Sequence, residues 1–185
     1  MGGDVINDND MKRILFVAIF FLFALPVMAQ TSLDGFWKTT QKSNGLTIKE
    51  TLCFEGDTCG KAKDVVYMGM LVMQDNVVIN GEVKITVEGE FSLKDNKLVI
   101  TWNPFTVTDE YTKEPIATVQ GQPNSMYTAS VKQSFDAIVA GSKINITNNS
   151  TDTYNVVAIE KGKMTLSQEV NGQVVEQVYK RLKKL

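Results

Sequence analysis

The fold is decided by the stretch Leu33-Asp34-Gly35-Phe36-Trp37-Lys38, taken together with Val178-Tyr179-Lys180-Arg181-Leu182 near the other end of the chain. Between them, apolar and polar residues alternate with period two and turn residues interrupt at short intervals, which is typical of antiparallel sheet. A Gly-x-Trp on the first strand and an arginine on the last would meet if the strands curl into a barrel. We therefore predict a mainly β protein, a single antiparallel up-and-down barrel of about eight strands with one inserted α-helix.

The hairpin turns predict the register of this sheet. Asn44-Gly45 is the strongest short hairpin signal, and it would join 35–41 to 46–54. In that register Trp37 faces Leu52 on the inner side of the sheet. Glu50 is the one charge that we expect on that side.

Further turns extend the same logic. Asp95-Asn96 would join two strands with Gly89 opposite Trp102, which leaves room for the indole to lie across a bending strand. Lys161-Gly162 and Asn171-Gly172 would join the last three strands. The alternation predicts one inner face there, made of Val157, Ile159, Met164, Leu166, Val175, Tyr179 and Arg181.

One helix is predicted among the strands. From Ser125 to Ala140 apolar residues recur at helical spacing, with Ser125 as N-cap and Gly141 as stop. The segment 104–123 before it is less regular, and 143–153 after it is predicted to be a polar loop. We expect the helix to pack across an open end of the barrel or against its wall.

The segment Val65–Met73 is apolar on both faces. This pattern predicts a strand lined on one side by the interior and covered on the other by a helix or loop. Met68, Met70 and Met73 could line a compliant cavity, although plain core is the more common role of such methionines.

The N-terminal residues have the features of an export leader. Lys12-Arg13 precedes the apolar run Ile14–Leu25, and Val27-Met28-Ala29 offers a small-residue cleavage site. The run is too short to span a bilayer comfortably, and no cysteine follows it as in a lipoprotein signal. We predict an extension over 1–10 and a cleaved leader from Met11, so that 30–185 form one barrel domain, periplasmic or secreted and without stable membrane insertion.

Composition argues against several functions. The chain has 19 basic and 21 acidic residues, a formal net charge of −2, and thus no electrostatic footprint for nucleic acid or an anionic membrane. It has no histidine, the most common general base and metal ligand. No phosphate-binding glycine-rich loop is present. We therefore expect no enzymatic activity, no metal and no cofactor.

Cys53 and Cys59 are the only cysteines. In an exported protein a disulfide across the short turn between them is the default prediction. Two free structural thiols are the alternative.

Several of these residues carry a family resemblance. Gly35-Phe36-Trp37 resembles the Gly-x-Trp of the lipocalin family, and Arg181 resembles the late-strand arginine that packs over that tryptophan. The segments 54–57 and 89–93 are similar to strand ends in bacterial lipocalin-like domains of exported proteins. The chain departs from the family in placing its helix before the final three strands. The resemblance implies that the glycine, the tryptophan and the arginine close the base of the barrel.

The resemblance also implies a function, the binding of a small, largely apolar molecule inside the barrel. A barrel of about eight strands can hold one small ligand, and an aromatic and methionine-rich interior suits apolar contents. Glu50 would orient a polar head or, more simply, pair with Arg181. The alternative is a packed barrel that serves as a secreted interaction module or inhibitor through its loops at 53–59 or 104–123. The predicted ligand contacts are Phe91, Trp102, Met164, Leu166, Tyr179 and Glu50.

Overall fold

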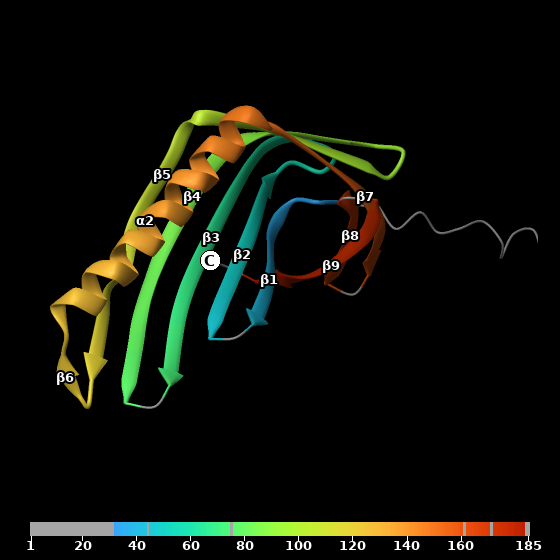
Figure 1. Ribbon diagram of the computed structural model, residues 1–185. Helices are drawn as coiled ribbons and strands as arrows, with labels where there is room; N and C mark the ends of the chain where they lie inside the picture. Colours follow the sequence, from blue (N-terminus) through green and yellow to red (C-terminus); the bar gives the residue numbers. More distant parts are fainter. Residues whose placement is uncertain (1–31, 44, 75, 161, 171, 184–185) are drawn as a thin grey trace, which may run out of the picture. The chain divides into compact units, whose positions relative to one another are not determined.

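A computed structural model describes residues 32–43, 45–74, 76–160, 162–170 and 172–183 (Figure 1). The predicted leader within residues 1–29 lies outside the described residues, as do the turn residues Asn44, Lys161 and Asn171. Within the described part of the chain, no helix is long and apolar enough to cross a membrane.

Eight antiparallel strands close into a barrel in the order β1-β2-β3-β4-β5-β7-β8-β9, and β9 returns to pair with β1. Each strand of the barrel neighbours the next one along the chain, so the predicted up-and-down barrel with one inserted helix is confirmed. The strands are β1 (Gly35–Ser43), β2 (Leu46–Glu55), β3 (Cys59–Gln74), β4 (Val77–Lys94), β5 (Lys97–Val119), the short β6 (Gln122–Pro123), β7 (Thr151–Glu160), β8 (Lys163–Val170) and β9 (Gln173–Leu182).

The predicted hairpin registers are confirmed. Trp37 pairs with Leu52 across β1 and β2, and Gly89 pairs with Trp102 across β4 and β5. The two residues of the Asp95-Asn96 turn have φ angles of 51° and 61°, as a two-residue turn between twisted strands requires. Local turn chemistry therefore sets the pairing of these strands.

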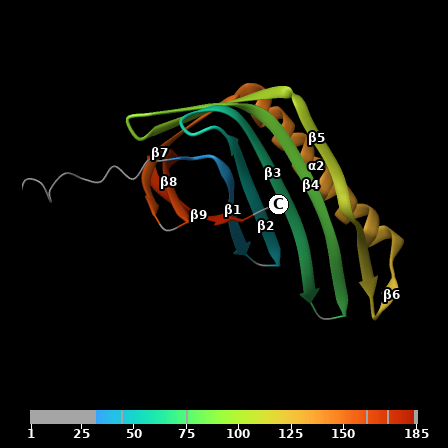
Figure 2. The same ribbon diagram turned by 180° about the vertical axis from the view of Figure 1, so that it is seen from behind.

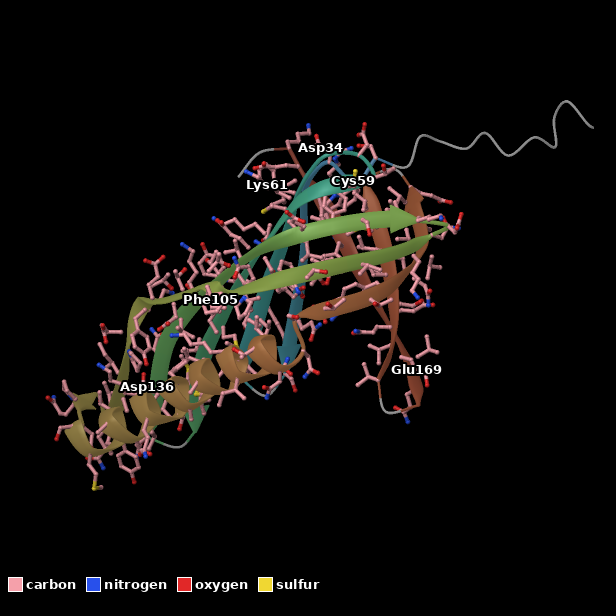
Figure 3. All side chains as sticks on the ribbon, turned by 90° about the horizontal axis from the view of Figure 1, so that it is seen from above. Asp34, Cys59, Lys61, Phe105, Asp136 and Glu169 are labelled. Atoms are coloured by element: carbon pink, nitrogen blue, oxygen red, sulfur yellow. The ribbon has the colours of Figure 1, made fainter. Side chains whose placement is uncertain are left out.

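Strand β5 is more regular than predicted, because it runs without interruption through the segment that the sequence marked as irregular. Glu88 of β4 pairs with Asn103, but Thr86 pairs with Thr108. The residues between them form a bulge that bends the strand. Phe105 lies on this bulge with 96% of its surface exposed (Figure 3).

A second bulge corrects the predicted inner face of the tail. The register of β7 against β8 shifts between Val156 and Ala158. Val156 therefore points inward and is 6% exposed, whereas Val157, the predicted inner residue, is 54% exposed. Val175 lies on the same face of β9 as Tyr179, as predicted, but it is 45% exposed because it is near the turn that joins β8 to β9.

The helix α2 (Ser125–Asn148) is longer than predicted. Asn124 rather than Ser125 caps it, because the Asn124 side-chain oxygen accepts a hydrogen bond of 3.0 Å from the backbone N–H of Tyr127. Gly141 does not end the helix. Ile146, one turn beyond it, packs against the barrel core, and this contact outweighs the weak helix propensity of glycine.

α2 packs against β4 and β5 where these long strands extend past the region in which β5 pairs with β7 (Figures 1 and 2). Phe135 lies directly on Gly81 of β4, where an added Cβ would come within 2.9 Å of the ring. Its ring also meets Tyr111 edge-on at 6.2 Å between centroids. The helix thus forms a second core cluster on the inner face of these strands, made of Val83, Ile85, Ala117, Val131, Phe135 and Val139.

Candidate functional site

One end of the barrel is closed by side chains of β1 and β9. Trp37 is 1% exposed and donates from Nε1 to the Leu33 carbonyl at 2.6 Å. The Arg181 guanidinium lies over the Trp37 ring, with Cζ 5.4 Å from the ring centroid, and donates from Nη2 to the Asp34 carbonyl. Gly35 has a φ of 116°, and an added Cβ would lie 3.3 Å from Arg181 Nε. The Gly-x-Trp and the arginine therefore meet as predicted.

The expected pairing of Glu50 with Arg181 does not occur. Arg181 pairs with Trp37 across β1 and β9, whereas Glu50 lies opposite Thr39, further along β1. The guanidinium remains exposed at the barrel end. Glu50 instead lies beside Tyr179, with 3.0 Å between Glu50 Oε1 and the phenol oxygen.

The apolar residues predicted to contact a ligand lie together in the packed core near this end. Each is 6% exposed or less, and all belong to the cluster that contains Trp37. Phe91, for example, meets Phe54 edge-on at 4.7 Å between ring centroids. This part of the barrel is filled by its own side chains. The residues concerned are Phe91, Trp102, Met164, Leu166 and Tyr179.

Next to the packed core lies a polar group of side chains that we call the acidic cluster. Asp64 of β3 pairs with Leu52 and so shares the inner face with Trp37. Asp152 of β7 pairs with the buried Ile100 and is therefore also on the inner side. The acidic cluster consists of Glu50, Asp64, Asp152, Tyr154 and Tyr179, of which the sequence had singled out only Glu50 and Tyr179.

The hydroxyl of Tyr179 links Glu50 to Gln177. The phenol oxygen lies 3.0 Å from Glu50 Oε1 and 2.8 Å from Gln177 Oε1, yet it has a single hydrogen to donate. When the hydroxyl donates to Glu50 Oε1, it stabilises the Glu50 carboxylate. Burial raises the pKa of Glu50, repulsion from Asp152 acts in the same direction, and only the Tyr179 hydroxyl opposes them.

Asp64 is a strongly perturbed member of the acidic cluster. Its Oδ1 is buried and has no hydrogen-bond partner. Burial, followed by repulsion from Glu50 and Asp152, raises the pKa of Asp64 well above its usual range. Asp152 differs, because its Oδ2 accepts a hydrogen bond of 2.6 Å from Trp102 Nε1. The cluster therefore holds one buried carboxylate oxygen without a donor, Asp64 Oδ1.

An apolar strip of β2 and β3, which we call the inner wall, adjoins the acidic cluster. Ile48 pairs with Met68, and Glu50 pairs with Val66, so these side chains share the inner face. The inner wall consists of Leu46, Ile48, Val66 and Met68, all partly exposed. α2 buries the corresponding part of β4, and Met68 packs against the edge of the same core cluster, while all four side chains of the inner wall keep part of their surface exposed. Apolar surface and buried carboxylates thus lie side by side inside the barrel.

The outer wall carries a groove of about 830 Å³ over β1 to β5. Phe36, Cys53, Val65 and Pro104 supply its apolar lining, and charged side chains of β2, β3 and β4 complete it. The exposed Phe105 follows Pro104 in the β5 bulge. This groove lies on the opposite side of the sheet from the acidic cluster.

The predicted disulfide is wrong, because both cysteines are free. Cys53 pairs with Lys63, whereas Cys59 lies at the start of β3, several residues nearer the hairpin tip. Four residues correspond to about 13 Å along the strand, more than a disulfide can bridge.

The two thiols should differ sharply in reactivity. Burial, with repulsion from Asp64, raises the pKa of the Cys53 thiol to about 11, whereas Cys59 is exposed (Figure 3). Because the thiolate is the reacting form, iodoacetamide at about pH 8 should label Cys59 rapidly and Cys53 only after unfolding. Peptide mass spectrometry measures this, and equal rates of labelling in the folded protein would contradict the buried position of Cys53.

By its architecture, the described part of the chain is an antiparallel eight-stranded β-barrel with one helix packed against its extended strands. Carboxylate side chains lie inside this barrel. Comparisons of the chain with family models, curated proteins and solved structures found no match.

Proposed function

We propose that this protein is an exported, lipocalin-like binding protein that holds one small amphipathic molecule in the open part of its barrel. The inner wall carries the proposal, since partly exposed Ile48, Val66 and Met68 lie inside a barrel whose base is densely packed. Adaptable apolar surface beside a few polar groups is what small-molecule sites usually offer. Export is supported by the leader pattern from Met11 to Ala29.

The arrangement differs from the site that the sequence predicted. Phe91, Met164 and Leu166 form the floor of the barrel rather than the ligand surface. The ligand would lie between the inner wall and α2, with its polar group toward the acidic cluster. Trp102 touches this cluster through Asp152, so its fluorescence should respond to an occupant.

Binding of a neutral solvatochromic dye such as Nile red tests the proposal. The dye should show a saturable rise in emission near one molecule per protein. Val66→Trp adds bulk to the inner wall and should weaken binding about ten-fold or more, since the indole takes the place of the dye. Leu71→Trp, on the exposed outer face of the same strand, is the matched control and should bind as the wild type does.

Unchanged affinity in Val66→Trp, with circular dichroism showing both variants folded, would contradict this location. Complete lack of saturable binding would favour the second candidate, a protein interaction module. The specific observation behind that candidate is Phe105, because fully exposed aromatic side chains are typical interface anchors. A barrel that works through Phe105 has no need of an open interior.

A further inference from the structure

The acidic cluster lacks a compensating cation. The ion pairs found among the described residues are Lys49–Glu82, Lys63–Glu88, Lys84–Glu110 and Lys143–Asp109, none of which includes Glu50, Asp64 or Asp152. In the described parts of β1, β2 and β3, the register places no lysine or arginine on the inner face. Arg181 is occupied at the barrel base.

Asp64 gives a second, independent indication that the cluster binds a hydrogen-bond donor. A buried carboxylate oxygen normally accepts hydrogen bonds, and leaving one without a donor is costly. Asp64 Oδ1 has none, although Glu50 and Asp152 each have a protein group within hydrogen-bond distance. Glu50 lies diagonally across the β2–β3 ladder from Asp64, about 7–8 Å away between Cα atoms.

We propose that the ligand is a small organic amine, whose ammonium group donates to Asp64 Oδ1 and is neutralised by Asp64 and Glu50 while its apolar body lies on the inner wall. This inference rests on the proposed function and names the chemical class of the ligand. An ammonium group has three donors, so it can serve Asp64 and a second carboxylate together.

A metal ion fits this cluster less well than an amine does. Among the described residues, no three carboxylate or thiol side chains are arranged to hold a metal. Metal ions require ligand atoms at about 2.0–2.6 Å on several sides. An amine requires only hydrogen-bond contacts to a carboxylate and apolar contacts for its carbon atoms.

The ionisation of the cluster predicts how amine binding should depend on pH. Burial raises the pKa values of Glu50 and Asp64, and repulsion from neighbouring carboxylates acts in the same direction, so protons compete with a cation for this site more strongly as the pH falls. A bound cation favours the ionised carboxylates and displaces those protons. Amine affinity should therefore increase as the pH rises from about 5 to about 8, while the affinity of an uncharged analogue should stay constant.

Calorimetric titration with octylamine, octanol and octanoate tests the head group at constant chain length. Octylamine should bind about ten- to a hundred-fold more tightly than octanol, and octanoate should bind more weakly than both, because charged hydrogen bonds favour the amine alone. Asp64→Asn keeps the shape of the side chain and should reduce the octylamine preference to less than about three-fold with octanol affinity unchanged. Glu50→Gln provides a second variant with the same expected direction. Glu90→Gln, on the exposed outer wall, is the matched control and should keep the full preference.

The outcomes separate this inference from the proposed function. Equal binding of octylamine and octanol would overturn the amine assignment and leave the binding function standing. If the preference for octylamine survives both Asp64→Asn and Glu50→Gln, the amine does not bind at the acidic cluster and the assignment is overturned. Loss of the preference in Glu90→Gln would place the amine on the outer wall and would overturn the assignment as well. If no octyl compound binds, the proposed function fails together with the inference.

Discussion

The free energy of unfolding should fall as the pH is raised from about 5 to about 8, contrary to the usual behaviour of carboxylates. The pKa values of Asp64 and Glu50 in the folded protein are raised from ordinary values of 3.8 and 4.5. The folded state therefore retains protons that the unfolded chain has already released. Stability is fully present below about pH 4 for these groups, and it is lost as the pH rises through their raised values.

The groups that face Asp64 also disfavour its ionisation, which supports a decrease of stability with rising pH. Glu50 comes from β2, Asp152 and Tyr154 come from β7, and Tyr179 comes from β9, and each is acidic or neutral. Only the backbone N–H of Val65 stabilises the Asp64 carboxylate. Ionisation of Asp64 thus meets repulsion on several sides.

Asp64→Asn should reduce the pH dependence and stabilise the protein at about pH 8 by about 1–3 kcal/mol, because asparagine cannot ionise and so removes a charge that would be buried among other carboxylates. Urea denaturation followed by circular dichroism at several pH values measures the change. Glu90→Gln, which removes an exposed outer-wall charge, should retain the wild-type slope. A wild-type protein that becomes more stable between about pH 5 and about pH 8 would contradict the buried position of the acidic cluster.

The strands and their pairing were predictable because the decisive signals are local. Asn44-Gly45 and Asp95-Asn96 set two hairpins through backbone geometry, and alternation then assigned every side chain to a face. Closure of the barrel followed from Trp37 and Arg181 reaching the same level of the sheet. These inferences needed only the turn residues and a period of two.

The departures arise where tertiary packing or a bulge overrides the local pattern. One additional residue near Val156 reverses the faces of β7, and no turn signal marks its position. The helix passes Gly141 because Ile146 has a buried surface to contact, which the sequence does not display. The positions of bulges, and the contacts between segments that are distant in the sequence, therefore have to be taken from the three-dimensional structure.

The acidic cluster was only partly visible in the sequence. Asp64 could have been found by continuing the β2–β3 register, which places it opposite Leu52. Asp152 was hidden, because the segment around it was predicted to be a polar loop rather than the start of β7. The three carboxylates belong to separate strands, and they form one cluster only because the barrel closes.

A large loss of stability from a small substitution should come from Gly89→Ala. An added Cβ at Gly89 would lie 2.3 Å from the Thr101 carbonyl oxygen and 2.9 Å from Trp102 Cα, both backbone atoms of the neighbouring strand β5. Backbone cannot move aside as a flexible side chain can, so the strands must separate where Trp102 packs into the core. We expect a loss of about 2–3 kcal/mol, at the upper end of the usual range for overpacked sites. Gly141→Ala is the matched control, since no atom lies within 4 Å of its added Cβ and alanine is the better helix former, so it should stabilise α2 by about 0.5–1 kcal/mol. Chemical denaturation of the two variants side by side measures this difference in sign, and a Gly89→Ala protein as stable as the wild type would show that β4 and β5 do not approach so closely.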